Sequence, residues 1–137
     1  MNKDIKDLIK QYEVKGSFTY ETISDEQIKE AESVLSVKIP SQYLEFLQEY
    51  GFGGIGGVEI IGVGGNGNLV FVEETLEYRR YGLPDNLIVI EDCGEWIYCI
   101  NVETEAVISW TEGFIKEEYF DFDSYVFDRF SDAAENL

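Results

Sequence analysis

The chain has 137 residues, of which 45% are hydrophobic and 15% aromatic, and this suffices to fill the core of one domain. Its formal net charge of -18 opposes binding to nucleic acid and anionic membranes, and the absence of histidine excludes Ser-His-Asp and Cys-His catalysis. No apolar run approaches the roughly 20 residues that span a bilayer, and the N-terminus lacks a hydrophobic signal region. We therefore expect a cytoplasmic protein.

The negative charge is concentrated in one part of the chain. Residues 1–40 contain six basic and eight acidic residues, whereas residues 41–137 contain four basic and twenty acidic ones. Between Tyr81 and Ile115 there are seven acidic residues and no basic residue. Acidity by itself keeps a protein soluble. Because the acidic residues are concentrated in one part of the chain, we favour a basic partner protein. The negative electrostatic field would speed association with such a partner.

Three helices are predicted in the N-terminal part. The first covers residues 3–12, where apolar side chains recur at helical spacing. The second starts after Ser24, which opens a capping-box sequence, and ends near Leu35. The third begins at Pro40, where proline is compatible with a helix start, and ends at Gly51.

The pattern then changes to strands. We predict strands at Val58–Val63 and Asn68–Val72, joined by a glycine-rich turn, and a short helix at Thr75–Tyr81. The segments Leu87–Ile90 and Trp96–Ile100 are continuously apolar, so we expect a central hairpin that is buried on both faces.

The remaining elements are a strand and a helix. Val107–Trp110 is the next predicted strand, and Asp123 or Ser124 is expected to cap a C-terminal helix. Helices, then strands, then a helix indicate an α+β fold with the helices packed on a largely antiparallel sheet. We expect one domain over residues 1–137.

Two stretches match the pattern G-x-G-x-x-G. The pattern binds pyrophosphate where it follows a strand and opens a helix. The first match follows a helix and the second joins two predicted strands, so we interpret both as loops. No Lys-Ser or Lys-Thr follows, which excludes a P-loop. The matches are Gly51, Gly53 and Gly56, and Gly62, Gly64 and Gly67.

Pairs of acidic residues recur along the chain. Two facing carboxylates can hydrolyse a glycoside or bind Mg²⁺ or Ca²⁺. With 28 acidic residues such pairs are unavoidable, and no EF-hand spacing occurs. A carboxylate-dependent hydrolase is therefore a remote alternative, and we expect no catalytic residues, metal or cofactor. Cys93 and Cys99 are interpreted as reduced core or hairpin residues.

Four segments of the chain follow one another in a familiar order. The first is an apolar residue and Pro40, followed by a helix that contains Phe46-Leu47 and has a glycine-rich end. The others are the hairpin of residues 87–100, a strand that ends in Trp110, and a helix that starts with Ser-Tyr at Ser124. Together these segments resemble the Smi1/Knr4 family of the SUKH immunity superfamily.

The resemblance covers nearly the whole chain, with two departures. Ser36 and Glu105 stand at turn positions where glycine is common in the family. The resemblance implies an interaction protein rather than an enzyme. Bacterial members are mostly cytoplasmic immunity proteins that neutralise a toxin, commonly a nuclease, while others are adaptors or regulators. The family has no shared catalytic residues, so none is transferred to this chain.

Our leading hypothesis is an immunity protein, or antitoxin, that binds and occludes a cognate toxin, a basic nuclease-type domain. A nuclease must be basic to hold nucleic acid, and this chain has the opposite charge. The alternative is an adaptor that binds an endogenous protein. The predicted contact acids are Glu91, Asp92, Glu95, Glu103, Glu105 and Glu112, with Trp96 or Trp110 as aromatic anchors.

Overall fold

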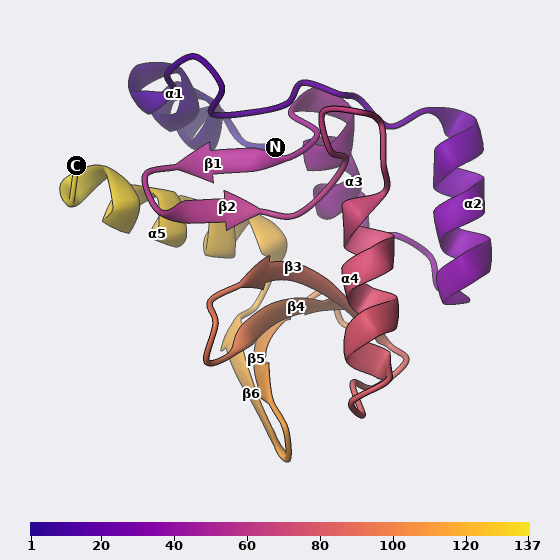
Figure 1. The fold of residues 1–137 in the computed structure, drawn as a ribbon. Coiled ribbons are helices and arrows are strands. Elements are labelled where there is room, and N and C mark those ends of the chain that lie inside the picture. The colour runs from indigo at the N-terminus through magenta and orange to yellow at the C-terminus, as the bar shows by residue number, and fades with distance from the viewer.

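The computed structural model describes residues 1–137 and has the predicted α+β architecture (Figure 1). Three helices come first, followed by a two-stranded hairpin, a fourth helix, a four-stranded sheet and a C-terminal helix. None of these helices is both long and apolar enough to cross a membrane. The elements are α1 (Lys3–Tyr12), α2 (Asp25–Leu35), α3 (Ser41–Glu49), β1 (Gly53–Ile55), β2 (Val58–Ile60), α4 (Val70–Arg79), β3 (Leu87–Asp92), β4 (Ile97–Asn101), β5 (Val107–Thr111), β6 (Phe114–Tyr119) and α5 (Phe122–Glu135).

The N-terminal helices begin and end at the signals in the sequence. The Ser24 side chain accepts the N–H of Gln27 at 3.1 Å, and the Gln27 side chain accepts the N–H of Ser24 at 3.0 Å, which completes the predicted capping box. Helix α3 starts directly after Pro40, and the chain leaves it through Gly51 at a φ of +77°. All three predicted helices are therefore confirmed.

The segment after the two-stranded hairpin differs from the prediction. We predicted a strand at Asn68–Val72, but α4 already begins at Val70 and includes most of the short helix expected from Thr75. The apolar run is one turn of a buried helix, and periodicity alone does not separate such a turn from a strand. Strand β2 pairs instead with β1, which is antiparallel to it. Strand β1 was not predicted, because two of its three residues are glycines, which have a low propensity for strands.

The larger sheet is antiparallel throughout, with the strand order β3-β4-β5-β6. The predicted hairpin is β3 and β4, but only β4 is internal, so the expectation that both strands are central was wrong for β3. Strand β3 is buried for another reason: the N–H of Ile61 donates to the carbonyl of Ile90 at 2.8 Å, and α4 packs along it. Strand β6 was not predicted, because its side chains are mostly exposed and its sequence lacks an alternation of apolar and polar residues.

The sheet is covered on opposite faces by two helices. From α4, the Thr75 hydroxyl accepts the N–H of Val89 at 3.0 Å. From α5, Tyr125 packs against Tyr98 with ring centroids 5.4 Å apart. Helix α5 is capped by Asp121, which accepts the N–H of Ser124 at 2.9 Å, and not by the predicted Asp123 or Ser124.

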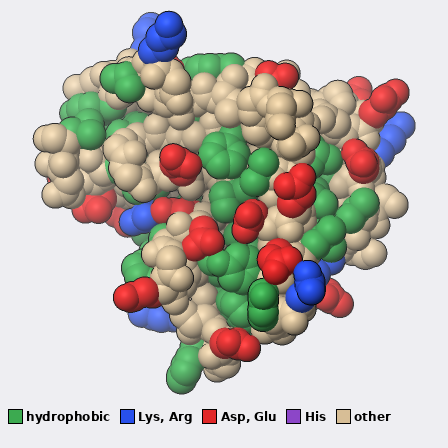
Figure 2. All heavy atoms as spheres, in the orientation of Figure 1, with side chains coloured by type: hydrophobic (Ala, Val, Ile, Leu, Met, Phe, Trp, Pro, Cys, Tyr) green, Lys and Arg blue, Asp and Glu red, His purple; other side chains and the backbone are tan.

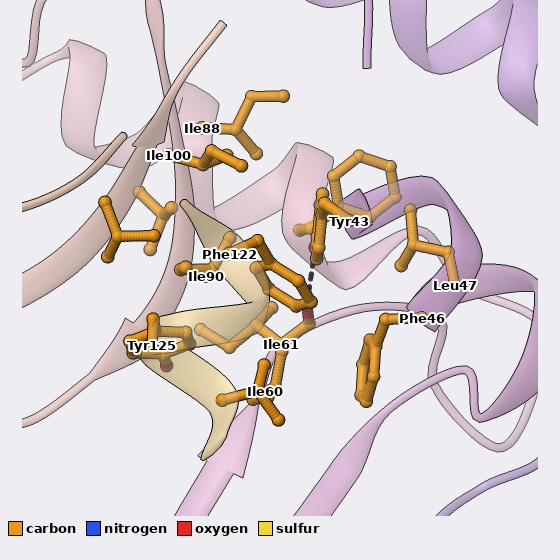
Figure 3. Close-up of a cluster of buried hydrophobic side chains, with 14 of the residues drawn as sticks. Tyr43, Phe46, Leu47, Ile60, Ile61, Ile88, Ile90, Ile100, Phe122 and Tyr125 are labelled. Carbon is orange, nitrogen blue, oxygen red and sulfur yellow. Dashed lines mark hydrogen bonds between the residues drawn. The ribbon is translucent and has the colours of Figure 1, made fainter. Parts of the chain in front are cut away.

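One hydrophobic core joins these layers, with 34 buried residues in a single cluster. Figure 3 shows Tyr43 and Phe46 of α3 near Phe122 of α5 and near Ile60 and Ile61 at the end of β2. The buried Tyr43 hydroxyl donates to the carbonyl of Ile61 at 2.5 Å, so its polar atom is satisfied inside the core. Through this core the four-stranded sheet packs against the helices. The turns between the strands lie at the two ends of the sheet.

Two turns contain the positions where the family favours glycine. Ser36 has a φ of +56° at the end of α2, and Glu105 has a φ of +66° in the turn between β4 and β5. Both residues adopt the left-handed region that glycine occupies at no steric cost. The departures noted in the sequence therefore coincide with backbone strain in the fold.

Candidate functional site

The order of strands decides which of the predicted site residues meet. In an antiparallel sheet, alternate turns lie at the same end. The turn after β3 holds Glu95 and Trp96, and the turn after β5 holds Glu112, so these residues share one end of the sheet with Asp92 and Trp110. Figure 1 shows the β5–β6 hairpin extending away from the helices toward this end.

We call this region the acidic–aromatic surface. Its aromatic residues come from α4, from the segment after α4, from the β3–β4 turn and from β5 and β6, and its carboxylates come from α4, from the end of β3 and from the two turns. Figure 2 shows acidic side chains gathered around hydrophobic ones over the region of α4, β3 and β4. The residues of the surface are Glu74, Tyr78, Tyr81, Asp92, Glu95, Trp96, Trp110, Glu112 and Phe114.

A hollow of about 160 Å³ lies in this surface. Three aromatic side chains line it, namely Tyr78, Tyr81 and Trp110, and the turn residues Glu95, Trp96 and Glu112 also border it. A second hollow shares Tyr81, Trp110 and Glu112 with the first and extends to Phe114 and Ile115. The two hollows are therefore neighbours that share the wall formed by Tyr81, Trp110 and Glu112.

Tyr78 connects the two sides of the first hollow. Its hydroxyl donates to the Asp92 carboxylate at 2.8 Å, and its ring meets Trp110 edge-on with centroids 6.0 Å apart. Burial, together with the hydrogen bond to Asp92, raises the pKa of Tyr78 well above its ordinary value. The hydroxyl therefore stays protonated and keeps Asp92 in a fixed orientation at neutral pH.

The two predicted tryptophan anchors occupy different places. Trp96 is 38% exposed, and its ring meets the Tyr98 ring edge-on with centroids 6.3 Å apart, on the face of the sheet that α5 covers. Trp110 is only 7% exposed and contributes to the floor of the hollow. Tyr81 and Phe114, at 58% and 76% exposure, add apolar surface beyond the two predicted anchors. Their only sequence signal is their proximity to the acidic segment.

Glu74 is a further residue that the sequence alone did not place here. The pKa of Glu74 is raised by partial burial, and then by the neighbouring carboxylates of Asp92, Glu73 and Glu77. The shift reports how closely α4 and β3 bring acidic groups together. Such crowding of like charges strengthens the local negative field.

Glu91 does not belong to this surface, so its prediction as a contact acid was wrong. A bulge between Val89 and Glu91 shifts the register, and the Glu91 side chain, only 4% exposed, lies on the face covered by α5. There it accepts hydrogen bonds from Tyr125 at 2.7 Å and from Arg129 at 3.1 and 2.5 Å. The hydrogen bond to Glu91 raises the pKa of Arg129.

Glu103 and Glu105 are exposed, but they lie in the β4–β5 turn at the opposite end of the sheet. The predicted set is thus divided: Asp92, Glu95 and Glu112 meet, and these two do not. A sequence pattern cannot reveal this division, since it depends on which turns share an end.

The glycine-rich segment has a structural explanation. Contrary to the prediction, the second G-x-G-x-x-G match lies between β2 and α4, so a helix does follow it. However, β2 pairs antiparallel with β1, unlike the parallel unit that binds dinucleotides. A Cβ on Gly62 would lie 1.9 Å from the carbonyl oxygen of Gly51, so close backbone packing requires this glycine. No group of three or more Cys, Asp or Glu side chains is arranged to hold a metal ion.

Comparison with known proteins agrees with this architecture. A crystal structure of a protein from Pseudomonas syringae pv. tomato is similar to the chain with a TM-score of 0.69 and 25% sequence identity, over 86% of this chain and 88% of that one. A SUKH family model described as SMI1-KNR4 cell-wall matches residues 5–131. The order of elements, the shared fold and this match lead to one conclusion: the chain belongs to the SMI1-KNR4 family of the SUKH superfamily.

Proposed function

We propose that this protein is an immunity protein that binds a basic toxin domain through the acidic–aromatic surface and blocks the groove where that toxin holds nucleic acid. The observation that supports this proposal most strongly is the aromatic hollow bordered by carboxylates. It lies in a chain of net charge -18, and no lysine or arginine lines it. Membership of the SUKH superfamily gives the proposal its biological setting.

The surface has the composition of an interface hot spot. Aromatic side chains supply apolar area that a partner can cover, and hot spots are enriched in tryptophan and tyrosine. The surrounding carboxylates would speed the encounter with a basic domain, whose nucleic-acid groove has the complementary charge. Because a nuclease groove is basic along its length, an acidic partner seated on it competes directly with the substrate.

The first experiment uses growth of a test bacterium. The C-terminal domain encoded by the neighbouring gene is expressed with and without this protein. Relief of killing by this protein supports immunity, and killing that persists with a soluble, expressed protein contradicts the proposed pairing. Purified complexes are then compared at several salt concentrations to measure the electrostatic contribution to association.

A matched pair of variants tests the surface itself. Glu95→Gln/Glu112→Gln removes two charges from the acidic–aromatic surface, and Glu103→Gln/Glu105→Gln removes two from the opposite end of the sheet. We expect the first pair to slow association several-fold and to flatten its salt dependence, while the second pair has a much smaller effect. Equal effects of the two pairs would contradict this choice of surface.

The second candidate function is an adaptor for an endogenous protein. The description of the matching family model, SMI1-KNR4 cell-wall, favours this candidate because it names a cellular process rather than a toxin. An adaptor predicts that deletion of the gene changes growth or cell-wall integrity with no toxin present. An immunity protein predicts that deletion is silent until the toxin is supplied.

A further inference from the structure

We propose that the 160 Å³ hollow is a receptor for one arginine side chain of the basic partner. This inference rests on the proposed function and makes it more specific, because it names the group that the acidic–aromatic surface recognises. The hollow would take the guanidinium group between its aromatic walls, with the carboxylates of Glu95 and Glu112 accepting N–H groups.

The size of the hollow suits a single long side chain. Pockets for drug-sized ligands and cofactors measure roughly 300–1,000 Å³, so the hollow is too small for a nucleotide. Its wall residues come from α4, from the segment after it, and from two different turns of the sheet, so several elements that pack on the core determine its shape. A partner can therefore insert a side chain without reorganising the fold.

The lining chemistry matches a guanidinium group better than an ammonium group. Arginine is planar, stacks on aromatic faces, is more weakly hydrated than lysine, and presents five donors that fit carboxylates. Tyr81 provides an exposed aromatic side chain and Trp110 the aromatic floor, while Glu95 and Glu112 provide the acceptors. Lysine would gain the charge attraction but less of the stacking.

The protein already contains this arrangement within its own fold. On the other face of the sheet, the Arg129 guanidinium carbon lies 5.3 Å from the centroid of the Tyr98 ring. The same guanidinium donates to the Glu91 carboxylate at 2.5 Å. An arginine held by an aromatic ring and a carboxylate is thus compatible with this sheet, and the hollow offers the same combination to an external arginine.

No basic side chain of the protein itself competes for the hollow. The two nearest arginines in the sequence are engaged elsewhere: Arg79 donates to the carbonyls of Leu35 and Asp85, and Arg80 pairs with Glu77. Glu95 and Glu112 form no salt bridge within the chain. Their carboxylates are therefore available to a cation from outside.

The test uses a short arginine peptide and the two tryptophan side chains as reporters. The peptide Ac-Gly-Arg-Gly-NH₂ is titrated into the full-length protein, and the indole N–H resonances are followed by NMR. The same peptide with citrulline removes the charge and keeps the shape, and a lysine version keeps the charge. We expect saturable shifts of Trp110, which lines the hollow, binding by citrulline at least about tenfold weaker, and lysine in between.

Variants locate the binding. Tyr81→Ala and Glu95→Gln/Glu112→Gln should each weaken binding of the arginine peptide by about fivefold or more. Phe120→Ala, which removes an exposed aromatic ring outside the hollow, and Glu103→Gln/Glu105→Gln should leave it within about twofold. Absence of saturable shifts, equal binding of citrulline, or equal loss in the control variants would overturn the inference.

Toxin neutralisation and peptide binding, measured together, can refute the arginine receptor and the immunity function independently of each other. If the toxin is neutralised with unchanged affinity by a variant that combines Tyr81→Ala with Glu95→Gln/Glu112→Gln, immunity stands and the arginine receptor is refuted. If the arginine peptide binds in the hollow but no toxin is neutralised, the receptor stands and immunity is refuted.

Discussion

The substitution Arg129→Met tests whether the pair of Arg129 and Glu91 holds α5 to β3. The Glu91 side chain is 4% exposed and the Arg129 side chain 20% exposed, and two hydrogen bonds join them. Methionine keeps much of the packing of the arginine stem but removes the charge. The carboxylate of Glu91 then remains buried, with the hydroxyl of Tyr125 as its remaining hydrogen-bond donor.

The expected cost follows from two limits. Breaking a buried ion pair by removing one partner costs about 3–5 kcal/mol. A glutamate can avoid a buried charge by taking up a proton, which costs about 3.7 kcal/mol at pH 7, given an ordinary pKa of about 4.3 and about 1.36 kcal/mol for each unit. We therefore expect a loss of about 3 kcal/mol at pH 7. At pH 5 the same protonation costs about 1 kcal/mol, so the loss should shrink to that size.

The assay is urea unfolding followed by tryptophan fluorescence and circular dichroism at both pH values. Arg80→Met is the matched control, because Arg80 is 76% exposed and its pairing with Glu77 should contribute only about 0–1 kcal/mol. A double-mutant cycle with Glu91→Gln should show that the paired losses are not additive. A loss below about 1 kcal/mol at pH 7, or a loss independent of pH, would refute this reasoning.

Three further predictions concern the acidic–aromatic surface, a close glycine contact and two turns. Partial burial and the neighbouring carboxylates raise the pKa of Glu74 above its ordinary value, so its charge costs stability at neutral pH. Glu74→Gln should raise Tm by roughly 1–3 °C at pH 7, and this gain should vanish as the pH falls to 4 and the carboxylate is protonated, measured by thermal melting. Gly62→Ala places a Cβ 1.9 Å from a backbone oxygen and should cost at least about 2 kcal/mol, whereas Gly57→Ala meets nothing and should change stability little in urea unfolding. Ser36→Gly and Glu105→Gly should each stabilise by about 0.5–1 kcal/mol in the same assay, since both residues have positive φ.

Each of these expectations has a clear contrary result. A gain for the glutamine variant that persists at pH 4 would mean that the charge of the side chain is not its cause. Equal losses for the two alanine variants would contradict the close backbone approach, and destabilisation by glycine at the two turn positions would contradict the strain argument.

Local signals in the sequence were sufficient for much of the fold. The capping box at Ser24, the proline before α3 and the continuously apolar segments of β3 and β4 were all read correctly, because each depends on a few neighbouring residues. The ordered motifs also pointed to the SUKH superfamily, and the family model confirms this. The concentration of negative charge is likewise a property of the sequence alone.

The elements that were missed depend on non-local packing. The run from Asn68 to Val72 has strand-like residues, yet burial against the core makes its second half helical. Strand β6 has no hydrophobic pattern, because it lies at an edge and pairs only with β5. Propensity is a weak guide in such segments, and tertiary contacts decide the outcome.

The candidate site shows the same division. The sequence determined which residue types are present, namely acidic residues and tryptophans in one segment without basic residues. Only the tertiary structure decided which of them meet: a bulge turned Glu91 inward to Arg129, and the alternation of turns placed Glu95 and Glu112 together and Glu103 at the other end. The physical reason is that a surface is assembled from residues distant in the chain, and their proximity depends on strand register, which only the packed sheet defines.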